Sequence, residues 1–129
     1  MPGTEIARMN LQALLDKYLH DPRISRIADA TLLPEPQRIS LRNLTGSSAE
    51  FVFSALYKHL SAADQNHLII LNDAEEAAYF HNTLENLIQP IDLFYFPASF
   101  KNKKNYRLLN SSHVMLRTEA LTRLSTGGN

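Results

Sequence analysis

The chain contains no cysteine, no excess of either charge and no long apolar run. Without cysteine it can form no disulfide and can use no thiolate. Lys plus Arg equals Asp plus Glu, at 13 each, which excludes strong whole-surface attraction to nucleic acid or to an acidic membrane but leaves room for a local basic patch. No window reaches the ~18 apolar residues of a membrane helix, and the N-terminus shows no signal peptide. We therefore expect a cytoplasmic protein.

The composition that remains fits one globular domain. The chain has 129 residues, of which 44% are hydrophobic and 20% charged, as in ordinary globular proteins. A chain of this length buries roughly two-thirds of its unfolded surface, which is enough for a real core.

The most informative segment is residues 43–50, which read N-L-T-G-S-S-A-E. A phosphate-binding loop reads G-x-x-x-x-G-K-[ST] between a strand and a helix. Thr45-Gly46-Ser47 keeps this pattern. The two glycine positions are Asn43 and Ser48, the lysine position is Ala49, and the position of the magnesium-binding hydroxyl is Glu50. A carboxylate stands where a nucleotide phosphate needs a cation, so we expect a degenerate loop that binds no cofactor.

The same segment predicts the start of a helix. Ser47 and Glu50 have the S-x-x-E spacing of a capping box, in which each side chain bonds the backbone amide of the other residue. The Glu50 carboxylate would also interact favourably with the helix dipole, by ~0.3–1 kcal/mol. In an intact loop those amides hold the phosphates. We expect the chain to satisfy them itself.

Helical periodicity appears in three further places. Residues 11–18 have apolar side chains at i, i+3, i+4 and i+7, and Asp21-Pro22 ends that helix. A mixed segment, residues 23–37, predicts a helical turn and a connector. Asn72 or Asp73 caps a later helix that Pro90 closes, and a last helix covers residues 118–124. The expected buried stripe of the helix before Pro90 is Ala77, Phe80, Leu84, Leu87 and Ile88.

Strand patterns alternate with these helices. Residues 38–41 alternate polar and apolar, residues 67–71 form a short apolar run, and residues 91–96 are rich in aromatics. Residues 113–116 predict either a short strand or the approach to the last helix. The alternation predicts an α/β fold, a three-layer and mostly parallel sheet of the P-loop NTPase-like helicase type. We expect an N-terminal helix and connector at residues 1–37 and a degenerate helicase-like domain at residues 38–129, as a fragment cut before its last strand.

Four blocks in order carry a family resemblance. They are Thr45-Gly46-Ser47 before a helix, residues 67–80 (HLIILNDAEEAAYF), residues 94–100 (FYFPASF) and residues 116–119 (LRTE). This set resembles the N-terminal region of the bacterial transcription-repair coupling factor, in a Bacteroidetes-like version. That region is itself similar to the damage-loading helicase subunit of nucleotide excision repair, in which the loop is intact and binds ATP. The resemblance covers roughly residues 41–124.

The resemblance implies a non-catalytic scaffold or docking domain. Coupling factors release RNA polymerase stalled at DNA lesions with a separate ATP-dependent DNA translocase motor, and they recruit nucleotide excision repair. The N-terminal module packs on other domains of the parent chain. It offers a docking surface to the damage-sensing ATPase subunit, mainly through the domain that follows this segment. The fragment itself would then be no enzyme, and contacts with RNA polymerase and DNA would belong to the parent.

A stand-alone nucleotide- or single-stranded-nucleic-acid-binding module is the alternative. Lys101, Lys103, Lys104 and Arg107 lie among aromatic residues, a pattern that can bind single strands by stacking and phosphate contact. We favour a solvated loop beside a strand whose aromatic side chains are core.

Other candidate groups have simpler interpretations. The five histidines, His20, His59, His67, His81 and His113, lack zinc spacing and have no cysteine partner, so we expect no metal site. Capping accounts for Asp73, Glu75 and Glu76 better than acid–base catalysis does. The Ser111-Ser112-His113 cluster has no nucleophile elbow, and we interpret it as a turn.

Overall fold

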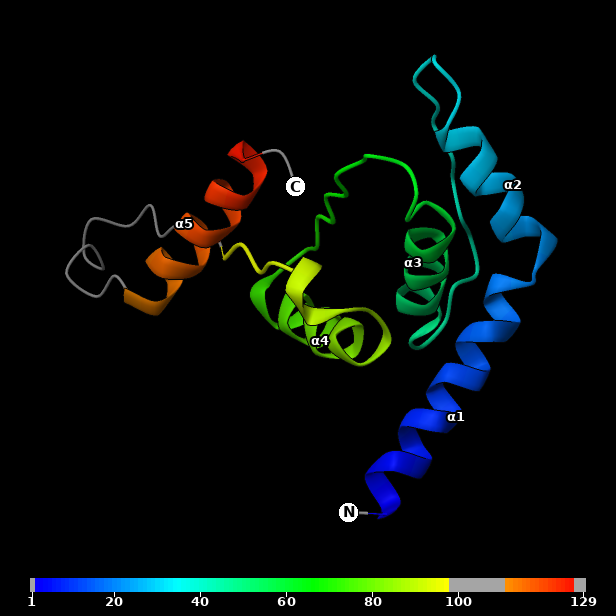
Figure 1. The fold of residues 1–129 in the computed structure, drawn as a ribbon, viewed down its shortest axis with the longest axis horizontal. Helices are drawn as coiled ribbons and strands as arrows, with labels where there is room; N and C mark the ends of the chain where they lie inside the picture. Colours follow the sequence, from blue (N-terminus) through cyan, green and yellow to red (C-terminus); the bar gives the residue numbers. More distant parts are fainter. Residues whose placement is uncertain (1, 98–110, 127–129) are drawn as a thin grey trace.

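The computed structural model describes residues 2–97 and 111–126, with the side chains of residues 10–90, 92–97 and 114–126. These residues form five α-helices and one 3₁₀ helix, and no strand. In chain order the elements are α1 (Pro2–Leu19), α2 (Pro22–Thr31), α3 (Ser48–His59), α4 (Ala74–Leu87), η1 (Pro90–Asp92) and α5 (Ser111–Ser125). Figure 1 shows α3 between the α1–α2 pair and α4, with α5 at the opposite end of the molecule from α1 and α2.

The predicted three-layer parallel sheet is wrong. Residues 38–41 and 67–71, and residues 93–96 beyond η1, adopt neither helix nor strand, and residues 113–116 belong to α5. The residue pattern of these segments favours an extended backbone. A β-ladder also needs a neighbouring extended segment in register, and a local sequence pattern does not supply one. A short apolar run such as Val114-Met115-Leu116 fits a helix as well as a strand by periodicity alone.

The helices were predicted more successfully, because caps and periodicity agree there. Helix α1 ends at Leu19, before Asp21-Pro22, as expected. Pro22 is the first residue of α2 and Asp21 its N-cap, so the expected helical turn is a full helix of 10 residues. Its buried residues, Ile24 and Ala28, are four positions apart and therefore share a face.

The core lies between α3 and the helices on either side of it. Helix α3 packs against α1, α2 and α4, and α1 also reaches α4. The expected α4 stripe is confirmed except at Ala77, which is half-buried, and Leu14 of α1 is exposed where we expected a buried face. The buried core residues are Leu15, Ile24, Phe51, Val52, Ala55, Phe80, Leu84, Leu87 and Ile88.

Residues 1–37 therefore contribute to the same core as the later helices, through Leu15 and Ile24. The proposed division of the chain at residue 37 stays a prediction. None of the described helices combines the length and the apolar character that a membrane crossing requires.

Candidate functional site

The loop before α3 has an unusual backbone. Asn43 has φ 62° and Gly46 has φ 58°, so both lie in the left-handed region that glycine and asparagine tolerate best. The Thr45 carbonyl accepts two hydrogen bonds, from the Ser48 amide at 3.1 Å and from the Ser48 hydroxyl at 2.5 Å. The loop thus closes on itself through Ser48, the residue at the second glycine position of an intact phosphate-binding loop.

The predicted capping box at this helix is wrong. Ser47 is the N-cap residue of α3, but its side chain makes no capping hydrogen bond. Glu50 turns into the protein and is 5% exposed, so its carboxylate does not fold back over the Ser47 amide. The S-x-x-E spacing permits the reciprocal bonds but does not oblige the carboxylate to stay at the surface.

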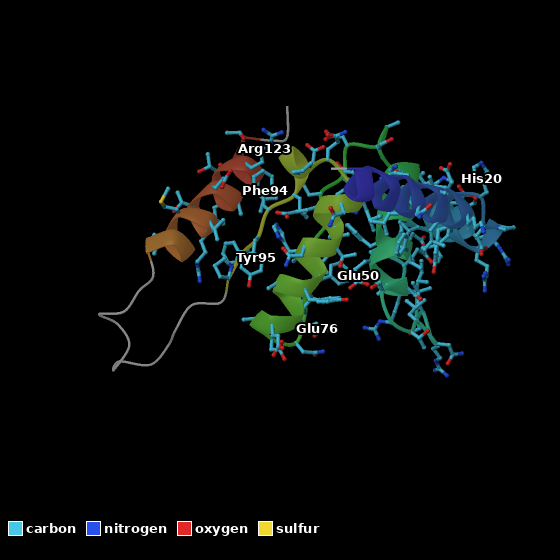
Figure 2. The ribbon with its side chains drawn as sticks, turned by 90° about the horizontal axis from the view of Figure 1, so that it is seen from below. His20, Glu50, Glu76, Phe94, Tyr95 and Arg123 are labelled. Carbon is cyan, nitrogen blue, oxygen red and sulfur yellow. The ribbon has the colours of Figure 1, made fainter. Side chains whose placement is uncertain are left out.

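Glu50 is the most unusual side chain of the site. Its Oε2 atom accepts no hydrogen bond from any residue that the structure describes, and the same holds for the hydroxyl of Ser54, one helical turn later. Ser54 is fully buried. Figure 2 shows Glu50 among the side chains between α3 and its neighbours. Two buried polar groups without a described partner therefore share one face of α3, although most buried polar groups in proteins are hydrogen-bonded.

Ala49, which aligns with the lysine of the phosphate-binding pattern, is also turned inward. Ala49 is half-buried and packs against the hydrophobic core. A cationic side chain does not stand at the start of α3, and the nearest charge along the helix is the Glu50 carboxylate. Ala49 and Glu50 therefore offer no positively charged side chain to a phosphate at the start of α3.

A reciprocal cap does occur, but at α4. The Asp73 carboxylate accepts a hydrogen bond from the Glu76 amide at 2.7 Å. The Glu76 carboxylate accepts from the Asn72 backbone amide at 3.0 Å and from the Asn72 side chain at 2.9 Å. Glu76 lies at the start of α4 in Figure 2. Of the two predicted cap residues, Asn72 and Asp73, the N-cap is Asp73, and both Asp73 and Glu76 serve to cap the helix.

The sequence did not reveal a cluster centred on Asp92. The Tyr57 hydroxyl donates a hydrogen bond to Asp92 Oδ2 at 3.0 Å, and Arg123 Nη2 lies 4.0 Å from Asp92 Oδ1. Partial burial, together with the hydrogen bond to the Asp92 carboxylate, raises the pKa of Tyr57. This cluster joins α3, η1 and α5, which no spacing in the sequence indicates because its members are 31 or more positions apart.

The aromatic segment after η1 is partly covered. Phe94 and Tyr95 are half-buried, while Phe96 is more exposed and carries the Arg117 guanidinium 4.6 Å from its ring centre. Figure 2 shows Phe94 and Tyr95 between α4 and α5. The prediction of a strand with core aromatic side chains is therefore wrong for the backbone, which forms no strand, and only partly met by the burial of the rings. The basic candidates Lys101, Lys103, Lys104 and Arg107 lie outside the described residues.

The described histidines are engaged individually. The ring nitrogens of His20 and His59 each lie 2.8 Å from a backbone carbonyl, of Asp16 and Leu19 respectively. His67 makes T-shaped contacts with Phe53 and Tyr57, and partial burial lowers its pKa.

The fourth described histidine, His81, lies 3.4 Å from Glu85 and meets the Tyr95 ring at its edge. Among the described residues, no three histidine, aspartate or glutamate side chains form a group able to hold a metal ion. The side chain of His113 lies outside the described ones. Its backbone belongs to α5, as does that of Ser111-Ser112, so the predicted turn is wrong.

A pocket of about 320 Å³ lies away from the Gly46 loop, between the end of α2 and the residues that follow it. Its polar side chains are Thr31, Glu35 and Gln37, all from one continuous stretch of chain. It brings together no pair of groups suited to acid–base or nucleophilic chemistry.

Comparison of the chain with protein-family models, with curated proteins and with solved structures gives no match.

Proposed function

We propose that this chain is a non-catalytic docking domain of the kind found in the N-terminal region of transcription-repair coupling factors. It acts through protein contacts and turns over no nucleotide. The ordered set of four sequence blocks supports the family, and the start of α3 supports the absence of turnover. The parallel sheet has no part in this proposal, because the described residues form no strand.

The observation that carries the proposal is the position of Glu50. This carboxylate lies in the first turn of α3 and is only 5% exposed. A helix N-terminus attracts anions because its amides are unpaired and its dipole is positive there. A carboxylate built into the first turn occupies that favourable field with the protein's own charge. An incoming phosphate would meet repulsion in place of attraction.

The neighbouring positions act in the same direction. Ala49 packs on the core, so the point charge that a lysine gives to terminal phosphates is missing. Ser48 hydrogen-bonds Thr45, which ties the loop to itself. In the parent protein, polymerase release and DNA translocation would depend on a separate motor, and this domain would pack on other parts of that chain.

The first prediction concerns nucleotide binding. In calorimetric titration with magnesium-ATP we expect no heat of binding at nucleotide concentrations up to about 1 mM, which corresponds to a binding free energy weaker than about −4 kcal/mol. The double variant Ala49→Lys, Glu50→Thr should gain measurable affinity, because it restores a cation and a hydroxyl at the loop.

A matched control separates loop chemistry from net charge. Glu75 and Ala78 are both exposed on α4, so Glu75→Thr with Ala78→Lys makes the same change of charge away from the loop. This control variant should show no heat of binding when it is titrated with magnesium-ATP. A dissociation constant tighter than about 1 mM for the unmodified chain would contradict the proposal.

Docking itself is tested by titrating the chain with the separately produced motor-containing remainder of the same coupling factor. We expect a complex to form. When the chain carries the control substitutions Glu75→Thr and Ala78→Lys, the affinity of that complex should be the same with and without magnesium-ATP. The damage-sensing ATPase subunit should bind this segment weakly on its own, since the resemblance puts its main contacts in the adjoining domain. The nucleic-acid-binding alternative depends on residues outside the described part of the chain.

A further inference from the structure

The segment between α3 and α4 has an exposed apolar edge. Leu68 is 83% exposed and Ile70 is 84% exposed, the two highest exposures among the large hydrophobic residues that the structure describes. Ile69 and Leu71, which alternate with them, pack against the core, and His67 contacts the rings of Phe53 and Tyr57. This two-residue alternation is that of an extended strand with one face on the protein and one in solvent.

The backbone of this segment is also without partners in the described part of the chain. No described residue hydrogen-bonds the amides or carbonyls of residues 66–71, and the pattern ends at Asn72, whose amide bonds Glu76. Figure 1 shows the segment as an open stretch of chain leading from α3 to α4. A row of free amides and carbonyls is a template for pairing with another extended backbone.

We propose that residues 67–71 form an interaction edge that pairs, antiparallel, with the same residues of a second copy of this chain. Ile69 lies at the centre of the pairing, so Leu68 of one copy stands opposite Ile70 of the other. This contact then occurs twice, related by a two-fold axis, as a symmetric dimer requires.

The composition of the edge fits this occupant. Residues 66–72 read N-H-L-I-I-L-N and carry no formal charge, so the pairing sets no like charges opposite one another. The chain as a whole has a formal net charge of zero, which leaves no long-range repulsion between copies. The sequence around Ile69 is apolar on both sides and flanked by asparagine at both ends, so the segment complements itself.

The dimer will be weak. A five-residue pairing buries far less than the ~800 Å² per partner of a standard stable interface. We therefore expect a monomer–dimer equilibrium with a dissociation constant between micromolar and millimolar. In sedimentation equilibrium the weight-average molar mass should rise with protein concentration over this range.

A charge-insertion variant tests the edge. Leu68→Lys with Ile70→Lys places like charges opposite each other in the dimer and should raise its dissociation constant about tenfold or more. Both side chains are solvent-exposed, so folding, followed by circular dichroism, should be unchanged. The matched control is Leu121→Lys with Leu124→Lys on α5, where the side chains are 54% and 55% exposed, and it should dimerise like the unmodified chain.

Cross-linking tests the register. The chain has no cysteine, so single-cysteine variants report one contact each. Mixed Leu68→Cys and Ile70→Cys chains should form the mixed disulfide in excess over either homodimer, because directly opposite residues are closer than diagonal ones.

Three results would overturn the proposal. The first is a monomer at every concentration, which is expected if the edge pairs with a strand of a different protein. The second is an unchanged dimerisation constant in the variant Leu68→Lys with Ile70→Lys. The third is a mixed disulfide that forms no more often than random pairing of the two cysteine variants predicts.

Discussion

At the scale of single residues, the buried Glu50 bears on stability and carries the proposed function. Burial of a carboxylate costs free energy unless hydrogen bonds or an opposite charge offset it. No described residue offers Oε2 a hydrogen bond, and the Ser54 hydroxyl beside it on the same helix face is also unpartnered. The site therefore keeps an acidic group where packing alone would favour an apolar one.

Replacing Glu50 with leucine should stabilise the protein by about 1 kcal/mol. Removing a buried carboxylate whose Oε2 has no described partner should stabilise the protein by about 1–3 kcal/mol, and loss of its favourable interaction with the helix dipole should cost about 0.3–1 kcal/mol. Urea denaturation measures the change. The control Glu75→Leu, at an exposed position of α4, should stay within about 0.5 kcal/mol of the original. Destabilisation by Glu50→Leu would mean that the carboxylate has a partner.

Asp21 gives a second prediction at this scale, a pH dependence. Hydrogen bonds from the Arg23 side chain, and then from the Arg23 amide, lower the pKa of Asp21 from 3.8 to about 2. Because the folded-state pKa is depressed, the stabilisation by this carboxylate is present above about pH 4 and is lost as the pH falls towards 2.

Denaturation midpoints measured between pH 4 and pH 2 should therefore fall less steeply in Asp21→Asn than in the original chain. Arg23→Gln should flatten the dependence too, since it removes the guanidinium that donates to Asp21. An unchanged slope in both variants would show that this pair does not contribute to acid sensitivity.

At the scale of elements, helices α3 and α4 begin in different ways. Asp73 accepts a hydrogen bond from the Glu76 amide at α4, whereas the Ser47 side chain makes no such bond at α3. Asp73→Ala should therefore cost about 1 kcal/mol of stability, and Ser47→Ala should cost distinctly less. Paired urea denaturation curves check the difference, and equal costs would contradict the capping geometry.

The elements also show where sequence reasoning works. The span and the buried stripe of α4 followed from Asp73, Pro90 and the spacing of Phe80, Leu84 and Leu87, because a cap, a terminator and a period all agree there. For residues 67–71 the nearly continuous apolar run predicted a strand covered on both faces, and this is wrong, because Leu68 and Ile70 are exposed. The lack of a pairing strand for them in the described part of the chain could not be predicted, because a hydrogen-bonded neighbour is a property of the fold and not of the segment.

At the scale of the whole molecule, the sequence indicated a different architecture. The expected sheet came from the alternation of patterns, and the described residues pack as helices around α3 instead. In the candidate site, residues 43–50 form the expected loop and helix start, and their interpretation as a degenerate phosphate-binding loop stays a prediction. The inward turn of Glu50 and the Asp92 cluster could not be predicted. Both depend on which side chains from distant segments meet, and a local spacing carries no such information.

The central place of α3 has a consequence for synthesis. Helices α1 and α2 bury Leu15 and Ile24 largely against a helix that begins at Ser48. A ribosome adds roughly 5–20 residues each second, so the nascent N-terminal part emerges some seconds before its covering surface does. During that interval its apolar side chains are open to water and to chaperones, and the arrival of α3 outside the exit tunnel is the event that first closes a core.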